Sequence, residues 1–283
     1  SSTGLAYSVE GSGPPLLCIT GYNAPSELLE PFVAPLRERF TCITYDLRGC
    51  GRTELAPTTL SVRAMAADAC DVLDSAGVGA AHVLGFSLGG MVAQELALLA
   101  PERVRSLVLA ATTAGGLDAD YAPPPIELGV ELVRTASRLG SLRVDLRVAL
   151  TQAWAAGTHD TTSRLSGIVA PTLVVHGEDD RLLRIGSAHQ IASLVPGADL
   201  ATIPGAGHLF FLDSDEGLER VSAWLEAHRD AEAPRDAMGD AGPTGAAALL
   251  RTQLLPWQHA WKAMRNRASQ AVALAQAATR LPG

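Results

Sequence analysis

The sequence has a single lysine, Lys262, and arginine supplies the rest of its side-chain positive charge apart from histidine. Acidic residues outnumber basic ones, 30 against 22, and the formal net charge is −8 at pH 7. Nucleic-acid binding depends on a basic face that neutralises phosphates, so we expect no nucleic-acid partner. No apolar run reaches the roughly 18 residues that span a bilayer, so we also expect no membrane span.

Cysteine is scarce as well, since Cys18, Cys42, Cys50 and Cys70 are the whole complement. They contain no Cys-x-x-Cys pair and no nearby histidine at metal-ligand spacing, which argues against a metal site. Three of them lie in or beside apolar runs, where a reduced thiol behaves as a small apolar group. We interpret them as buried thiols, which fits a cytoplasmic protein.

What the sequence does contain is an alternation of apolar strand patterns and amphipathic helix patterns over 283 residues. The patterns follow one another without hairpin signals, which predicts parallel strands joined by crossovers. We therefore expect an α/β fold, with a mostly parallel twisted sheet and helices on both of its faces. The expected strands are 5–10, 16–20, 41–45, 82–84, 106–110, 171–176 and 199–203, and the expected helices are 27–40, 62–76, 88–100 and 216–228.

Two regions depart from this alternation. In the first, two amphipathic segments, near 126–139 and 141–154, follow each other with no clear strand between them, which indicates a helical cap inserted into the core. The second mixes acidic residues, Gly and Pro, as linkers do, and leads into an Ala-rich helical tail. The predicted division is a core of 1–113 and 168–229, a cap of 114–167, a linker of 230–245 and a tail of 246–283.

The tail has apolar residues at helical spacing, among them Leu250, Leu254, Trp257 and Trp261. Such a face predicts docking on the core, or a homodimer in which the tail docks on a second copy of the chain. Alanine dominates where a membrane-bound helix would carry large apolar residues, which argues against membrane attachment.

One pentapeptide indicates a catalytic serine. Gly85-Phe-Ser-Leu-Gly89 matches the pattern G-x-S-x-G and falls between an expected strand and an expected helix. In that context the serine sits on a sharp turn and projects from the carboxyl edge of the sheet, where parallel sheets bind ligands. The glycines permit the turn, and Ser87 is the candidate nucleophile.

A serine needs a base, and the base needs an acid that orients it. The loop 204–208 follows the last expected strand and ends in His208, the candidate base. Glu178, Asp179 and Asp180 all follow the preceding strand, and we favour Asp180, with Asp179 as the alternative. The resulting order of serine, acid and histidine is the one expected for this topology. His82 and His176 fall inside strands and are predicted to be packed and hydrogen-bonded.

The same edge of the sheet supplies candidates for the rest of a site. The backbone N–H groups of Tyr22 and Leu88 are candidates for stabilising an oxyanion, because a loop and a helix N-terminus end there. Phe86, Leu209 and Phe210 flank the catalytic candidates and suggest an apolar binding site for the acyl group.

The loop 46–53 follows another strand at this edge. We expect Asp46 and Arg48 to fix it by ion pairing and hydrogen bonds, and Cys50 is a candidate for the border of the pocket.

Together these motifs resemble the α/β-hydrolase superfamily, particularly its small serine esterases, haloperoxidase-like perhydrolases and lactonases. The resemblance rests on segments 46–52, 85–90, 101–109, 171–180 and 205–208. It implies a Ser87–His208–Asp180 triad, an acyl-enzyme mechanism and an oxyanion site at Tyr22 and Leu88, with no metal or cofactor. Two features depart from the family pattern: Thr20-Gly21 stands where His-Gly is usual, and the tail has no counterpart.

The main hypothesis is a serine hydrolase acting on a carboxylic ester, lactone or thioester of a small to medium metabolite. The alternative keeps the site and changes the reaction, to C–C bond hydrolysis or to a lyase or cyclase step of a biosynthetic pathway, because fold alone does not separate these. A third hypothesis is a ligand-binding or interaction protein that retains the triad without using it.

Overall fold

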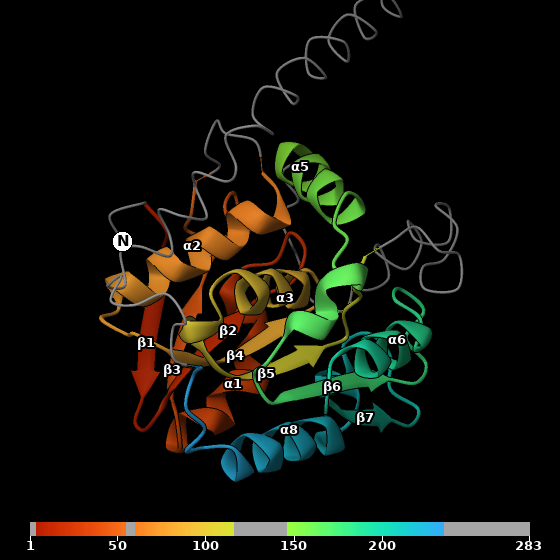
Figure 1. Cartoon of the computed structure of the whole chain (residues 1–283). Coiled ribbons are helices and arrows are strands. Elements are labelled where there is room, and N and C mark those ends of the chain that lie inside the picture. The colour runs from red at the N-terminus through yellow and green to blue at the C-terminus, as the bar shows by residue number, and fades with distance from the viewer. Residues whose placement is uncertain (1–3, 55–59, 116–145, 235–283) are drawn as a thin grey trace, which may run out of the picture.

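The computed structural model describes residues 4–54, 60–115 and 146–234 (Figure 1). Within them one twisted sheet has the strand order β1-β3-β2-β4-β5-β6-β7. All neighbouring strands run parallel except β1, which pairs antiparallel with β3. The predicted α/β architecture with a mostly parallel sheet is confirmed. The strands are β1 (Tyr7–Gly11), β2 (Pro15–Ile19), β3 (Thr41–Tyr45), β4 (Ala81–Phe86), β5 (Val104–Ala110), β6 (Thr172–Gly177) and β7 (Asp199–Ile203).

Helices cover both faces of the sheet (Figure 1). The longer ones are α2 (Val62–Ser75), α3 (Leu88–Leu99), α5 (Leu146–Gly157), α6 (Gly186–Leu194) and α8 (Asp215–Ala227). One apolar cluster joins α2, α3, α5 and α6 to the sheet, and a second joins α1 (Glu30–Val33), α7 (Phe210–Asp213) and α8 to the opposite face. Central strand β4 is buried along its whole length, which fixes the turn that follows it at the middle of the molecule.

Local chemistry explains where the helices begin and where one expectation fails. Ser61 caps α2 by accepting a hydrogen bond from the Ala64 N–H, as its position before the apolar pattern predicts. The single helix expected over 27–40 is wrong. The chain there forms η1 (Ser26–Leu29), α1 and η2 (Ala34–Glu38), because Pro31 and Pro35 each remove a backbone donor and start a new short segment. A further short turn, η3, spans Pro101–Arg103.

Part of the predicted cap lies within the described residues. The helix expected near 141–154 corresponds to α5, and η4 (Thr162–Gly167) follows it before the chain returns to β6. The helix expected at 126–139 and the tail at 246–283 lie outside the described residues, as does most of the linker. The division into core, cap, linker and tail therefore stays a prediction. Within 4–54, 60–115 and 146–234, no helix is long and apolar enough to span a membrane.

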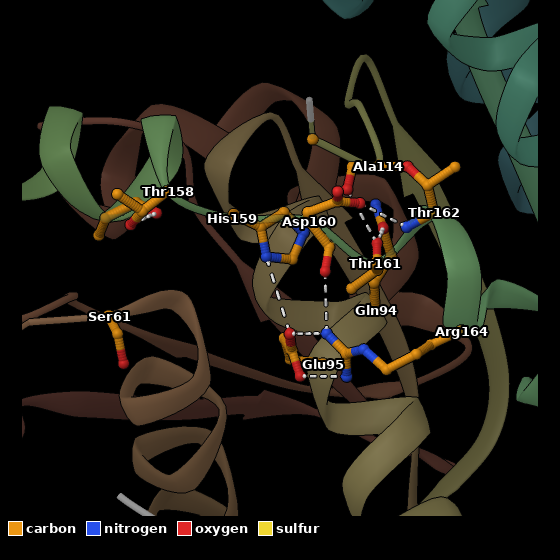
Figure 2. Close-up of polar contacts among 12 residues, drawn as sticks. Ser61, Gln94, Glu95, Ala114, Thr158, His159, Asp160, Thr161, Thr162 and Arg164 are labelled. Carbon is orange, nitrogen blue, oxygen red and sulfur yellow. Dashed lines mark hydrogen bonds and ion pairs between the residues drawn. The ribbon is translucent and has the colours of Figure 1, made fainter. Parts of the chain in front are cut away.

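The chain that follows α5 is bonded to α3, the helix after Ser87 (Figure 2). Arg164 makes a two-pronged ion pair with the buried Glu95 of α3. The Thr161 hydroxyl donates to the Gln94 side-chain oxygen at 2.6 Å, and the Thr161 N–H donates to the Ala114 carbonyl at 2.8 Å. A β-bridge joins Gly115 to Asp160. The two ends of the predicted cap therefore meet on α3.

His159 lies within this cluster, with its Nδ1 atom 3.8 Å from Glu95 (Figure 2). Burial lowers the pKa of its imidazole from 6.5 to about 4, although Glu95 acts in the opposite direction. Between these values the unfolded chain binds the proton and the folded chain does not. This contribution to stability is complete above pH 6.5 and is lost as the pH falls toward 4.

We expect the His159→Phe variant to be less sensitive to acid. Between pH 7 and pH 5, its unfolding free energy should fall by about 2 kcal/mol less than that of the wild type. Urea denaturation at the two pH values measures this difference. Equal losses in the two proteins would contradict the prediction.

Candidate active site

Ser87 occupies a strained turn between β4 and α3. Its φ of 54° lies in the left-handed region, which a residue with a side chain seldom adopts. Two hydrogen bonds hold it there: its N–H donates to the Ala110 carbonyl at 2.9 Å, and its carbonyl accepts from the Thr112 hydroxyl at 2.7 Å. A Cβ atom on Gly89 would collide with the Ile19 carbonyl, and one on Gly85 with the Gly89 carbonyl. The flanking glycines are required by close backbone contact.

His208 lies in the loop between β7 and α7, and its ring faces Ser87. Its Nε2 atom is 3.0 Å from the Ser87 hydroxyl, and its Nδ1 atom is 2.8 Å from Asp180 Oδ2. Because an ionised carboxylate only accepts, Nδ1 carries the proton and its N–H donates a hydrogen bond to Asp180. Nε2 then accepts from the Ser87 hydroxyl, so the neutral ring is in the tautomer that suits a base.

Asp180 lies just past the end of β6 and is buried. Its Oδ1 atom accepts hydrogen bonds from the N–H groups of Leu182 and Leu183, at 2.8 and 2.9 Å. Burial alone raises the pKa of this carboxyl. The adjacent His208 and hydrogen bonds from His176 and His208 outweigh burial and hold the pKa well below its ordinary value. Asp180 is therefore ionised at neutral pH.

The two other acids of this loop are exposed. Glu178 accepts a hydrogen bond from the Thr202 hydroxyl at 2.8 Å, and among the three acids only Asp180 is hydrogen-bonded to the ring of His208 in the described part of the chain. The geometry therefore favours Asp180 over Asp179.

The loop after β2 passes directly against the serine. A Cβ atom on Gly21 would lie 3.3 Å from Ser87 Cβ and 3.2 Å from the Phe86 ring. Tyr22 follows in this loop, and Leu88 is the first residue of α3. Neither backbone N–H has a hydrogen-bond acceptor among the residues that the structure describes.

Known proteins resemble this chain in both sequence and fold. A model of the alpha/beta hydrolase fold matches residues 14–136. The Mycobacterium tuberculosis protein BpoC, which bears the name "Putative non-heme bromoperoxidase", is 30% identical over 249 residues, which cover 76% of this chain and 94% of BpoC. The chain belongs to the α/β-hydrolase family. The BpoC crystal structure superimposes with a TM-score of 0.68 at 25% identity, over 80% of this chain and 97% of BpoC.

The sequences of two other relatives match most of the length of this α/β-hydrolase. The poly(3-hydroxyalkanoate) depolymerase of Ectopseudomonas oleovorans is 30% identical over 254 residues, covering 80% of this chain and 89% of the depolymerase. The polyketide synthase ThaQ of Burkholderia thailandensis is 34% identical over 257 residues. That match covers 79% of this chain but 12% of ThaQ, so the α/β-hydrolase corresponds to a small part of the synthase.

His176 contacts the acid in a way that the strand pattern did not reveal. Its Nε2 atom lies 3.1 Å from Asp180 Oδ2 and 2.8 Å from the Leu183 carbonyl oxygen. Both partners are acceptors, so Nε2 carries the proton and donates to them. The prediction that His176 is packed and hydrogen-bonded is confirmed, and so is that for His82, which contacts Ser106 and the Arg229 carbonyl. The position of His176 at the end of β6, four residues before Asp180, was the available signal.

The predicted apolar residues differ in their surroundings. The Phe86 ring lies 5.2 Å from the His208 ring and is buried. Leu209 and Phe210 are also buried, and Phe210 packs edge-on against Phe32 of α1 in the core. Their contact with a substrate stays a prediction.

Asp46 and Arg48 do fix their loop, but through different partners. Asp46 accepts hydrogen bonds from the N–H groups of Ser26 and Arg52, and Arg48 forms an ion pair with Asp68 of α2. Cys50 is buried, and burial raises the pKa of its thiol to about 11. No group of three or more His, Cys, Asp or Glu side chains in the described segments is arranged to hold a metal ion.

Proposed function

We propose that this α/β-hydrolase is a serine hydrolase that cleaves a carboxylic ester, lactone or thioester of a small to medium metabolite. One observation carries the proposal: hydrogen bonds run from the Ser87 hydroxyl to His208 and on to an ionised, buried Asp180. This is the geometry of nucleophile, base and orienting acid that acyl transfer requires.

In the first half of the proposed reaction, Ser87 Oγ attacks the carbonyl carbon of the substrate while His208 Nε2 takes the hydroxyl proton. Asp180 holds the ring in place and stabilises the imidazolium that forms. The N–H groups of Tyr22 and Leu88 donate to the developing oxyanion, helped by the partial positive charge at the N-terminus of α3. His208 then gives its proton to the leaving alcohol or thiol, and an ester to Ser87 remains.

In the second half, His208 takes a proton from a water molecule, which attacks the acyl-enzyme carbonyl. The same two N–H groups stabilise the oxyanion of this second tetrahedral intermediate. When the intermediate collapses, His208 returns the proton to Ser87 and the acid is released. The depolymerase relative adds support, because a poly(3-hydroxyalkanoate) joins its units by ester bonds.

A fluorophosphonate probe tests the nucleophile directly. The wild-type protein should form a stable adduct with one equivalent of probe, and Ser87→Ala should form none, because the serine oxygen is the atom that attacks phosphorus. Ser193→Ala, at an exposed position on α6, is the matched control and should be labelled like the wild type.

Intact-protein mass spectrometry measures the adduct. Labelling that persists in Ser87→Ala would overturn the proposal. The substrate class would then be identified by assaying the wild-type protein against a panel of esters, lactones and acyl thioesters. Activity on a C–C bond substrate without ester turnover would favour the alternative reaction.

A further inference from the structure

Helix α5 holds the loop that carries Tyr22, although about 130 residues separate them in the chain. The side-chain oxygen of Gln152 accepts a hydrogen bond from the Asn23 N–H at 2.6 Å. The Tyr22 hydroxyl donates to the Ala149 carbonyl, one turn earlier on α5, at 2.8 Å. Both contacts join the predicted cap to the loop that passes against Ser87.

The Gln152 side chain is fully buried and hydrogen-bonded at both ends of its amide group. Its oxygen accepts from the Asn23 N–H, and its amide nitrogen donates to the Cys50 sulfur at 3.2 Å. Burying an amide costs free energy unless its groups are paired, and an apolar residue would fill the same space without that cost. The polar side chain is therefore explained by the backbone N–H that it captures.

That N–H belongs to the peptide unit immediately after Tyr22. Asn23 has φ of 50°, in the left-handed region, so the chain turns sharply at this residue. Fixing the Asn23 amide fixes the peptide plane on the carboxyl side of Tyr22 and limits rotation of the Tyr22 N–H on its other side. On the other side of the loop, the Thr20 hydroxyl donates to the Pro25 carbonyl at 3.3 Å.

We propose that Gln152 is a positioning residue for the oxyanion loop: from α5 it aims the Tyr22 N–H at the reacting carbonyl oxygen. The inference rests on the proposed function and goes beyond it, since it makes oxyanion stabilisation depend on the position of α5. Helix α5, which lies outside the sheet, thus supplies outer support for the loop in which Thr20-Gly21 stands in place of the usual His-Gly.

The test uses the full chain with a p-nitrophenyl butyrate substrate and butylboronic acid, which forms a tetrahedral adduct with a catalytic serine. Gln152→Met keeps the length of the side chain and removes the acceptor for the Asn23 N–H. Removal of an oxyanion donor costs about 10²–10³ in kcat, and a misaimed donor should cost less, roughly 10- to 100-fold. We expect that loss in kcat, an equal weakening of boronate inhibition, and KM within about 3-fold of wild type.

The control is Thr151→Ala, the neighbouring position on α5, whose hydroxyl donates to the Arg147 carbonyl within the same helix. It should match the wild type in kcat and boronate affinity. Fluorophosphonate titration reports the fraction of active protein and should give the same equivalents for all three proteins. A purely structural role would lower those equivalents and leave the kcat and boronate affinity of the active fraction unchanged, which would overturn the inference.

If Gln152→Met does not fold, Tyr22→Phe provides the second test, because it removes the bond to Ala149 and keeps the ring. We expect a loss of roughly 3- to 10-fold in kcat and in boronate affinity, and wild-type values would overturn the inference.

The two proposals fail separately. A wild-type protein without Ser87-dependent labelling refutes the proposed function, whereas a labelled wild type with an unaffected variant refutes the role of Gln152 alone.

Discussion

Replacement of His208 by alanine is expected to lower kcat for ester hydrolysis by roughly a million-fold, the scale of loss when a serine hydrolase loses its nucleophile or base. The Ser87 hydroxyl would lose the acceptor for its proton, because His208 Nε2 is the atom that lies 3.0 Å from it. The leaving group would also lose its proton donor. Steady-state hydrolysis of p-nitrophenyl butyrate, with purified protein at high concentration, measures the residual rate.

The exposed His189 of α6 offers a matched control. His189→Ala removes an imidazole of the same kind and should keep wild-type kcat. A loss smaller than about 100-fold in His208→Ala, in protein that melts at the wild-type temperature, would contradict a role as general base. It would favour the hypothesis in which the three side chains persist in a ligand-binding protein.

Replacement of Asp180 by asparagine should lower kcat by about 10⁴-fold, the effect known for this change in a triad. The carboxylate accepts from His208 Nδ1 at 2.8 Å and from the Leu182 and Leu183 N–H groups through its other oxygen. An amide of the same shape carries no charge to stabilise the imidazolium. Its NH₂ group also favours the tautomer in which Nε2 carries the proton and no longer accepts from Ser87.

Asp179→Asn is the control for this change, because the neighbouring side chain is exposed and has the same chemistry. It should hydrolyse p-nitrophenyl butyrate at the wild-type rate. If Asp179→Asn lost activity and Asp180→Asn kept it, Asp179 would be the functional acid, and the observed hydrogen bonds of Asp180 would be structural.

Much of the fold could be predicted because its signals are local. The expected strands 41–45 and 199–203 have the same bounds in the structure as in the sequence pattern, and Ser61 marks the start of α2. The broken helix at 27–40 could have been recognised from its two prolines. The antiparallel pairing of β1 with β3 could not, since the alternation of a strand says how it is buried and nothing about which strand it joins.

The candidate site divides in the same way. Ser87, Asp180 and His208 stand at fixed offsets from strand ends, so the topology brings them to one edge of the sheet, and their spacing alone was informative. Gln152 and Glu95 do not stand at a recognisable offset from a strand end. Their partners, Asn23 and Arg164, lie 129 and 69 residues away, and a buried glutamine or glutamate on an amphipathic helix has the same pattern as an exposed one.

The bridge between Gly115 and Asp160 marks a place where a segment of this α/β-hydrolase could be exchanged. The bridge brings the two ends of the intervening segment together, so a segment of another length or composition could be grafted between Gly115 and Asp160 without moving the core on either side. Such a chimera would report selectivity contributed by the grafted piece alone. The graft would have to bring its own partner for the Asn23 amide, because Gln152 is removed with the native segment.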